Sequence, residues 1–472
     1  MSVKAPLGAT PEGGAFDVTT SAALVEPATQ VRRRAGRRTR AERIGIGATI
    51  SIPLLGLFLC MAGTRTGALV PATISIWPAN STMAGPLEFI GVNLTVGEVV
   101  ATLLVLVAGY LVALRYSEHI PQRLTIWAVA AFTTIVLIGP PLFSTDVFSY
   151  QVYAKMFAVY HINPYVHGPY AIYGDPLYQW IGAKWINTPS VYGPLFTFVS
   201  SAFSASSVAF NDLAFKLIAA AASGGTLYLI WKSAQRRGVD PARGIALFGL
   251  NPLVTLYGVG GGHNDLLMLL LTTSGIYAVL ARRDRSAGVM ITAGTAIKLT
   301  GAIVLPFALL GEAGRALSGR RRRLLAGAAS TTAVVAAASY VAFGTDILHI
   351  THTLQAVQDE GSWQSLPGFV FAQAHISVTH GVRIGDEVVL VGAIAWLLHR
   401  VWQGRMDWID GAAWATFAVL ATAWSLLPWY VCWLMPLVAL SSSRRLWNVA
   451  TVATLMGSAI MIAACIPSWN WL

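Results

Sequence analysis

The sequence predicts an all-α protein that crosses a membrane many times. Of its 472 residues, 55% are apolar and only 11% are charged, whereas a soluble globular protein has roughly a quarter charged residues. The apolar residues gather in continuous runs, many of them as long as a membrane-spanning helix requires. Because these runs do not alternate apolar with polar residues, they favour a helical bundle over a β-barrel.

A polar tail, residues 1–43, precedes the first run. It ends in a cluster of arginines and is predicted to be a disordered, basic, cytoplasmic tail, with the transmembrane domain covering 44–472. Thirteen hydrophobic segments follow, and 287–301 and 302–311 are predicted to be broken helices, which gives about 11–13 spans. The segments are 44–63, 94–114, 124–143, 212–231, 244–258, 264–281, 287–301, 302–311, 322–343, 386–402, 411–425, 428–441 and 447–466.

The positive charges predict the orientation. With the N-terminus in the cytoplasm, 26 of the 32 Lys and Arg residues fall in inner connections and flanks, and only four fall in outer ones. Such an excess of inner cations is typical of membrane proteins. Residues 191–209 are predicted to lie at the outer interface or to re-enter, because counting them as a span would place Arg236, Arg237 and Arg243 outside.

Two large outer loops follow from this topology, 144–211 and 344–385, and long loops tend to carry function. The same charge distribution accounts for the net charge of +11 without a nucleic-acid partner. The three cysteines, Cys60, Cys432 and Cys465, lie in apolar runs and suggest small buried thiols, with neither a disulfide nor a metal site. Motifs of P-loop nucleotide binding, of Rossmann cofactor binding and of zincin proteases do not occur.

The first outer loop opens with an acid and a row of aromatic residues. Asp146 comes three residues after an apolar run, and Tyr150, Tyr153, Phe157 and Tyr160 follow at helical spacing. This spacing predicts an aromatic helix along the membrane interface, ended by the Asn-Pro pair at 163–164. At the start of that helix, Asp146 is either a general base or a helix cap.

Other polar residues near the outer face are candidates for binding a substrate. His263, Asn264 and Asp265 follow three glycines at the start of a span, where they position a sugar or phosphate or simply cap the helix. Lys298 lies inside a span, and it either holds a phosphate or snorkels to the interface. Lys216 is predicted to snorkel.

Two further cations and several rings lie in the outer loops. Lys155 and Arg383 either bind the phosphate of a donor or anchor the protein at the interface. The loop aromatics either stack on sugars or contact the membrane interface. They are Tyr165, Tyr170, Tyr173, Tyr178, Trp180, Trp185, Tyr192 and Trp363.

Several short motifs together resemble a known family. The chain is similar to the GT-C glycosyltransferases, and within them to the actinobacterial polyprenol-phosphate-mannose-dependent α-(1→6)-mannosyltransferases of lipomannan and lipoarabinomannan synthesis. The motifs that carry the resemblance are Asp146-Val147-Phe148-Ser149-Tyr150, Asn163-Pro164-Tyr165, Val191-Tyr192-Gly193-Pro194-Leu195, Gly262-His263-Asn264-Asp265, Lys298-Leu299-Thr300-Gly301 and Leu427-Pro428-Trp429-Tyr430.

The resemblance implies a GT-C-type bundle in the plasma membrane, with its active site on the extracytoplasmic face. It implies an inverting transfer of mannose from a polyprenyl-phosphate donor to a lipid-anchored glycan of the cell envelope, with Asp146 as the catalytic base. The expected substrate-binding residues are Tyr150, Tyr153, Lys155, Tyr192, His263, Asn264, Asp265, Lys298 and Arg383.

No cofactor is expected, since the donor already carries its leaving group. Many GT-C enzymes have a second acid early in the first loop that sometimes holds a metal. The acid available here, Asp175, has Pro- and Tyr-rich surroundings that do not form a ligand set. Two alternatives stay open, namely a lipid-linked sugar flippase or other secondary transporter, and a GT-C transferase of arabinofuranose or glucose.

Overall fold

The computed structural model describes residues 39–70, 72–73, 83, 85–311 and 319–466. These residues form helices joined by turns and loops, with no strand among them. The all-α prediction is therefore confirmed. The helices are α1 Arg40–Gly63, α2 Val96–Arg115, α3 Gln122–Ile138, α4 Asp146–Ala158, α5 Pro194–Ser201, α6 Val208–Arg237, α7 Pro241–Gly249, α8 Asp265–Leu280, α9 Asp284–Ile297, α10 Val304–Gly311, α11 Gly319–Phe343, α12 His349–Glu360, α13 Leu366–Gln373, α14 His380–Trp402, α15 Trp408–Thr422, α16 Met435–Ala439 and α17 Arg444–Ala464.

Each of the thirteen predicted segments coincides with a helix or a bent pair of helices. Within the described part of the chain, five helical stretches are long and apolar enough to cross a membrane, or six if α7 and the adjoining turn Leu253–Val259, bent by 49°, count as one span. Others, such as α3 and α8, are apolar but shorter. The protein is thus a multi-pass membrane protein.

The predicted pair of broken helices is confirmed, but the break lies at Lys298 and not between 301 and 302. Lys298 separates α9 from the 3₁₀ turn Leu299–Ile303 that leads into α10. The segment 191–209, which was predicted not to span the membrane, holds the eight-residue helix α5 and the first two residues of α6. A helix of eight residues rises about 12 Å and is too short for the roughly 30 Å core of a bilayer.

Local sequence signals explain several helix ends. Thr95 and Glu98 form a reciprocal capping box at the start of α2. The hydroxyl of Ser207 accepts a hydrogen bond from the backbone N–H of Phe210 at the start of α6, and the helix ends at Gly238 with a φ of 68°. Glycine adopts this left-handed conformation without steric cost, so it stops the helix cleanly.

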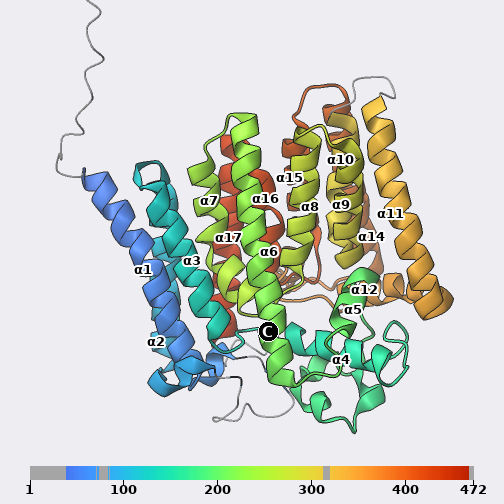
Figure 1. Ribbon diagram of the computed structural model, residues 1–472, viewed down its shortest axis with the longest axis horizontal. Helices are drawn as coiled ribbons and strands as arrows, with labels where there is room; N and C mark the ends of the chain where they lie inside the picture. The colour runs from blue at the N-terminus through green and yellow to red at the C-terminus, as the bar shows by residue number, and fades with distance from the viewer. Residues whose placement is uncertain (1–38, 71, 74–82, 84, 312–318, 467–472) are drawn as a thin grey trace, which may run out of the picture. The chain divides into compact units, whose positions relative to one another are not determined.

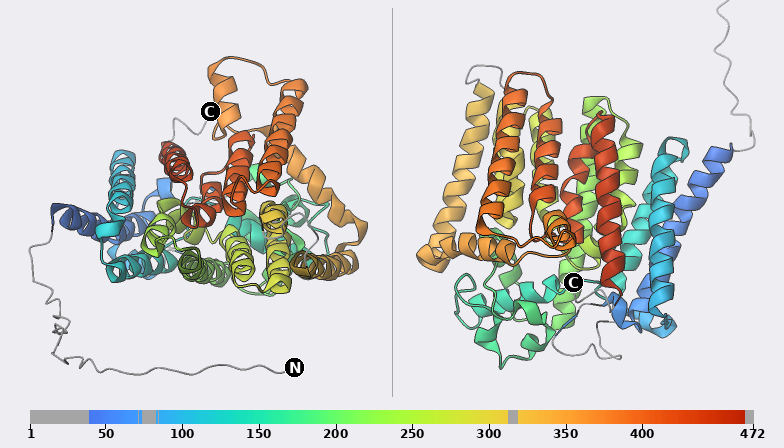
Figure 2. Two further views of the ribbon diagram at one scale, coloured as in Figure 1. Left: turned by 90° about the horizontal axis from the view of Figure 1, so that it is seen from above. Right: turned by 180° about the vertical axis from the view of Figure 1, so that it is seen from behind.

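The long helices run side by side, and the two large loop regions gather at one end of them. Figure 1 shows α4 and α5 of the first loop, and α12 of the second, at the end of the bundle opposite to the short connections between α6 and α7, α8 and α9, and α14 and α15. Figure 2 shows α1, α2 and α3 as a group at one edge of the bundle. Segments far apart in the sequence therefore meet at the loop-bearing end.

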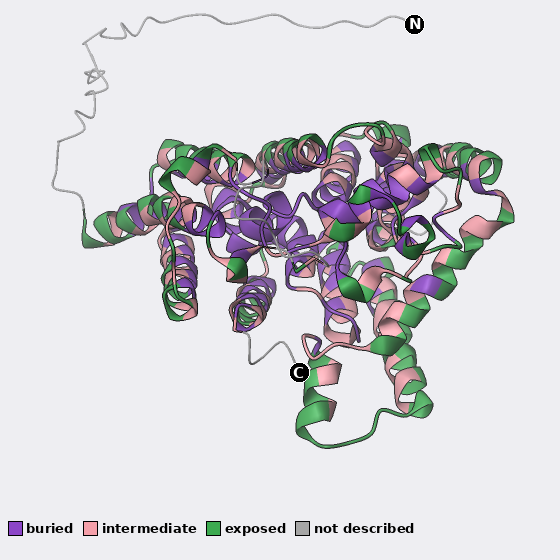
Figure 3. Cartoon of the chain, turned by 90° about the horizontal axis from the view of Figure 1, so that it is seen from below, coloured by how far each residue is buried: buried purple, intermediate pink, exposed green. Residues whose placement is uncertain are grey.

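Burial separates the centre of the bundle from its periphery. Figure 3 shows buried residues concentrated in the middle and exposed residues on outer helices. On α14 only Leu397 and Val401 are buried, while Val388 and Trp396 are exposed. Large apolar side chains on the outside of a helix bundle fit contact with lipid.

The helix α4 differs from its prediction. It ends at Ala158, before the Asn-Pro pair, and the chain then turns at His161, which has a φ of 55°. Tyr150 and Tyr153 are buried while Tyr160 is exposed, so the aromatic residues do not form one exposed stripe. The predicted aromatic helix is therefore present, but its end was predicted wrongly and its aromatic residues are mostly enclosed, because α5, α6 and the rest of the loop pack around α4.

Candidate functional site

A cavity of about 280 Å³ lies where both loop regions meet the helix bundle. Of the ten predicted site residues, it brings together Asp146, Tyr153, Tyr192 and Lys298. Its lining residues are Asp146, Ser149, Tyr153, Trp185, Thr188, Pro189, Val191, Tyr192, Lys298, Leu299, Thr300, Ile303, Leu354, Val357, Gln358, Val419, Ser425, Leu427, Tyr430 and Trp433.

Asp146 is the first residue of α4, and Thr145 occupies the capping position. A carboxylate in the first turn interacts favourably with the helix dipole. The side chain of Asp146 is 16% exposed, and its Oδ2 lies 3.4 Å from Nδ1 of His263. The carboxylate is thus open to the cavity and held near a second polar group.

The turn before α4 fixes where Asp146 lies. The backbone N–H of Leu142 donates to the carbonyl of Gly260, and that of Phe143 donates to the carbonyl of Leu69. Lys216 is buried, and its Nζ donates to the carbonyls of Gly139 and Pro140 at 2.6 and 3.3 Å. The prediction that Lys216 snorkels is therefore wrong: its ammonium caps the end of α3, where unpaired carbonyls favour a cation.

The three glycines before His263 lie close to neighbouring atoms of the chain, so that a side chain would not fit at the first two. A Cβ on Gly260 would lie 2.2 Å from the carbonyl oxygen of Leu256, and one on Gly261 would lie 2.8 Å from that of Tyr257. Gly262 has a φ of 61°. The glycines thus allow a tight turn that places His263 between α4 and α8, rather than an open loop for a ligand.

His263 is buried between two carboxylates. Its Nδ1 lies 3.4 Å from Oδ2 of Asp146 and 3.8 Å from Oδ2 of Asp265, and its ring packs against Trp429 with centroids 4.1 Å apart and planes tilted by 33°. Within the described residues, neither ring nitrogen has a partner of hydrogen-bond geometry. A buried polar ring without full hydrogen bonding is costly, which is typical of functional sites.

Lys298 joins the cavity to α8. Its Nζ donates to Oδ1 of Asp265 at 2.8 Å, and Nε1 of Trp433 donates to the same oxygen at 2.5 Å. The ammonium also lies 4.4 and 5.2 Å from the ring centroids of Tyr430 and Trp433, which stack on each other. Cation–π contact and the carboxylate together fix the position of this cation.

Tyr150 and Asn264 are buried next to the residues that line the cavity. The hydroxyl of Tyr150 donates to Oδ1 of Asn264 and accepts from its backbone N–H, at 3.4 and 3.3 Å. The Tyr150 ring packs edge-on against Tyr192. The hydroxyl of Tyr153 donates to the carbonyl of Thr188 at 2.6 Å, so the cavity wall is tied to α4.

The structure does not bring Lys155 or Arg383 to the cavity. Lys155 pairs with Asp175 at 2.7 Å. The guanidinium of Arg383 donates to the carbonyls of Gln358 and Asp359 at the end of α12, at 2.8 and 2.6 Å. Both cations bind partners within the loop regions 144–211 and 344–385.

Several polar or aromatic residues of the cavity had no predicted role, among them Tyr430, Trp433 and Gln358. Tyr430 and Trp433 flank Lys298, and Gln358 comes from α12. The Leu-Pro-Trp-Tyr motif at 427–430 contains Tyr430, and Trp433 follows it three residues later. The amide of Gln358 bonds to the backbone of Trp424 and Ser425, and no spacing in the sequence signals that contact.

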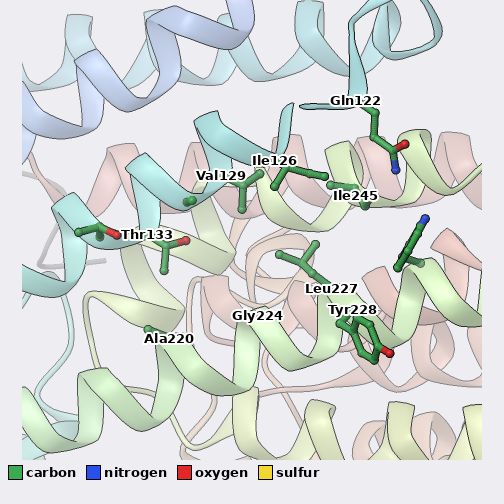
Figure 4. Close-up of a pocket in the computed structure, with 12 residues that line it drawn as sticks. Gln122, Ile126, Val129, Thr133, Ala220, Gly224, Leu227, Tyr228 and Ile245 are labelled. Carbon is green, nitrogen blue, oxygen red and sulfur yellow. The ribbon is translucent and has the colours of Figure 1, made fainter. Parts of the chain in front are cut away.

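A second cavity, of about 500 Å³, lies between α3, α6 and α7. Figure 4 shows Ile126, Val129, Leu227 and Ile245 among its walls. No carboxylate, cation or histidine lines it, so it lacks the groups for acid–base chemistry or phosphate binding.

Comparison with known proteins places the chain in a family. Residues 51–314 match the family described as alpha-(1->6)-mannopyranosyltransferase, N-terminal domain. The chain belongs to this family. The matched region includes Asp146 and Lys298, which line the cavity, and the buried residues His263 and Asp265, which contact them.

Individual relatives are distant. The chain is 28% identical over 182 residues to alpha-(1->6)-mannopyranosyltransferase A of Corynebacterium glutamicum, covering 38% of this chain and 37% of the relative. It is 28% identical over 354 residues to alpha-(1->6)-mannopyranosyltransferase A of Mycobacterium tuberculosis, covering 68% and 67%. It is 24% identical over 382 residues to a probable alpha-(1->6)-mannopyranosyltransferase of Mycolicibacterium smegmatis, covering 71% and 67%.

Proposed function

We propose that this membrane protein transfers mannose from a polyprenyl-phosphate donor to a lipid-anchored glycan at the outer face of the plasma membrane, forming an α-(1→6) linkage. The observation that carries the proposal is that Asp146 and Lys298, a carboxylate and a cation from distant segments, line one cavity. Transfer from a sugar phosphate needs both a base for the acceptor and a cation for the leaving group.

Lys298 is the group proposed to hold the donor phosphate. An ammonium has three N–H donors, and one of them is used by Asp265. The others are available to phosphate oxygens, and the rings of Tyr430 and Trp433 keep the ammonium oriented. Because the donor already carries phosphate as its leaving group, no nucleotide cofactor is required.

Asp146 is proposed as the base that activates the acceptor. Its carboxylate takes the proton of the acceptor hydroxyl while the hydroxyl oxygen forms a bond to the anomeric carbon of the donor. The bond from that carbon to the phosphate oxygen breaks, and polyprenyl phosphate leaves with the electron pair. A single displacement inverts the configuration, so a β-linked donor gives an α-linked product.

The distribution of Lys and Arg supports the proposal that the active site lies on the outer face of the membrane. The cavity lies at the end of the bundle that carries 144–211 and 344–385, whereas the connections rich in Lys and Arg lie at the other end. A lipid-linked donor reaches such a cavity from within the membrane, and the relatives named as mannopyranosyltransferases support mannose as the sugar.

The test is an assay of the detergent-purified protein with a panel of polyprenyl-phosphate sugars and short synthetic mannoside acceptors. We expect a new α-(1→6) mannosidic bond with the mannose donor, identified by mass and NMR. Lipid movement in proteoliposomes without a new bond would establish the transporter alternative instead. Transfer of arabinofuranose or glucose, but not mannose, would keep the transferase and change its sugar.

A further inference from the structure

We propose that a pair of exposed tyrosines, Tyr170 and Tyr173, forms a subsite that binds the acceptor oligosaccharide some distance from the point of transfer. The inference rests on the proposed function, because it assumes that the cavity at Asp146 acts on a glycan. It adds a second place where that glycan touches the protein, outside the cavity.

The two tyrosines form an open aromatic platform. Their rings stack with centroids 5.6 Å apart at 22°, and Tyr178 packs edge-on against Tyr170. Tyr170 is 57% exposed and Tyr173 is 69% exposed. The faces of such rings are suited to the apolar C–H faces of a sugar, and the hydroxyls reach water and sugar hydroxyls.

The loop that carries the platform is held rigidly. Asp175 is 8% exposed, and its carboxylate accepts from Nζ of Lys155 and from the hydroxyl of Tyr160, both at 2.7 Å, and from the backbone N–H of Leu177 at 2.8 Å. Ile172 and Leu177 point inward and are buried. A platform fixed in this way loses little entropy on binding a ligand.

The backbone of the loop that carries the platform contacts the segment that includes Trp185 of the cavity wall. The backbone N–H of Tyr170 donates to the carbonyl of Ile186 at 2.8 Å, next to Trp185, which lines the cavity. Gly168 packs so closely on Asn187 that a Cβ would lie 2.4 Å from its carbonyl carbon. A glycan whose end lies at Asp146 therefore leaves the cavity along Trp185 toward Tyr170.

The composition of the surface favours a sugar over a lipid. Between 169 and 186, Tyr170 and Tyr173 are the exposed large hydrophobic residues, while Ile172, Leu177 and Ile181 are buried. A surface that inserts into a membrane exposes aliphatic side chains as well. Figure 1 also shows this loop region projecting past the ends of α8 and α9.

The test compares two acceptors, a synthetic α-(1→6)-linked mannobioside and the corresponding hexamannoside. We expect Tyr170→Ala/Tyr173→Ala to raise KM for the hexamannoside about tenfold and to leave kcat and the KM for the mannobioside unchanged. Tyr170→Phe/Tyr173→Phe keeps the ring faces and should retain most of the affinity. Tyr340→Ala removes a tyrosine that is 65% exposed on α11 and serves as the control.

A direct measurement separates this inference from the proposed function. Saturation-transfer NMR on the purified protein reports hexamannoside binding without any turnover, and we expect the signal to be lost in the double alanine variant. If the wild type transfers mannose and the alanine variant has the same KM and kcat as the wild type for both acceptors, the subsite is overturned and the proposed function stands. If the wild type transfers nothing yet binds hexamannoside through the two tyrosines, the proposed function fails, and the tyrosine pair is a glycan-binding site but not a subsite for an acceptor.

Discussion

Nδ1 of His263 lies 3.4 Å from Oδ2 of Asp146, and this contact joins the start of α4 to the turn before α8. It explains why a helix-start acid and a glycine-rich turn belong to the same site. The imidazole is buried, whereas the carboxylate opens into the cavity.

Replacing Asp146 with Asn should abolish transfer while the protein still folds. The amide keeps the shape of the carboxylate but accepts no proton, so we expect kcat to fall by about 10²–10⁴-fold. Product formation from labelled donor measures the loss, and thermal unfolding in detergent measures folding. Glu118→Gln changes an exposed acid of the α2–α3 turn and should have no effect; near-normal turnover of Asp146→Asn would refute the base assignment.

His263→Phe should lower kcat much more than it changes KM for the acceptor. A phenyl ring can keep the packing against Trp429, but the substitution removes both nitrogens and with them the contact to Asp146. A displaced base costs up to about 100-fold in rate. Steady-state kinetics and thermal unfolding check this prediction. If kcat falls only as far as the fraction of folded protein falls, His263 has a structural role alone.

Lys298→Met should raise KM for the lipid-phosphate donor. Losing a charge-assisted hydrogen bond costs about 1.5–3 kcal/mol, which corresponds to roughly 10–100-fold in affinity. The single variant leaves the buried Asp265 without its cation, so the double variant Lys298→Met/Asp265→Asn is the matched control. We expect the double variant to regain stability without regaining donor affinity; recovery of both would mean that Lys298 serves the ion pair only.

Gly193→Ala should disturb the position of Lys298 from the neighbouring loop. The backbone N–H of Gly193 donates to the carbonyl of Ile297 at 3.0 Å, and a Cβ would lie 2.1 Å from the carbonyl oxygen of Ala296. We expect a loss of about 1–3 kcal/mol of stability together with weaker donor binding, measured by thermal unfolding and donor KM. Gly224→Ala adds a methyl group where nothing lies within 4 Å, and it should be neutral.

The loop at Asp175 should lose local stability in acid. Burial by itself raises the pKa of the Asp175 carboxyl, but the hydrogen bonds from Lys155 and Tyr160 outweigh it and hold the pKa below its usual value. The stabilisation is therefore complete above the unfolded-state pKa, about 3.9, and is lost as pH falls through the lower folded-state pKa. Hydrogen exchange of residues 169–181 measures this.

Asp175→Asn provides the comparison for that experiment. At neutral pH we expect it to lower the protection of this loop by about 1–3 kcal/mol and to remove the acid dependence that the wild type shows. Exchange that depends on pH equally in both proteins would contradict the assignment of the effect to Asp175.

The sequence alone determined the helical elements, because lipid demands continuous apolar runs and satisfied backbone groups. All thirteen runs became helices or bent pairs. The sequence also predicted broken helices over 287–311 and no full span over 191–209, although it placed the break between 301 and 302 and not at Lys298. It also marked Asp146, His263, Asp265 and Lys298 as unusual polar residues at helix ends.

Only the tertiary structure decided which partner each polar group meets. The sequence did not distinguish the partners of three cations near the loop-bearing end of the bundle. Lys155 binds Asp175, Lys216 binds the end of α3, and Arg383 binds the end of α12. Lys298 alone among these four lines the cavity. Spacing along a chain fixes the face of a helix on which a residue lies, but the neighbour across that face depends on how distant helices pack.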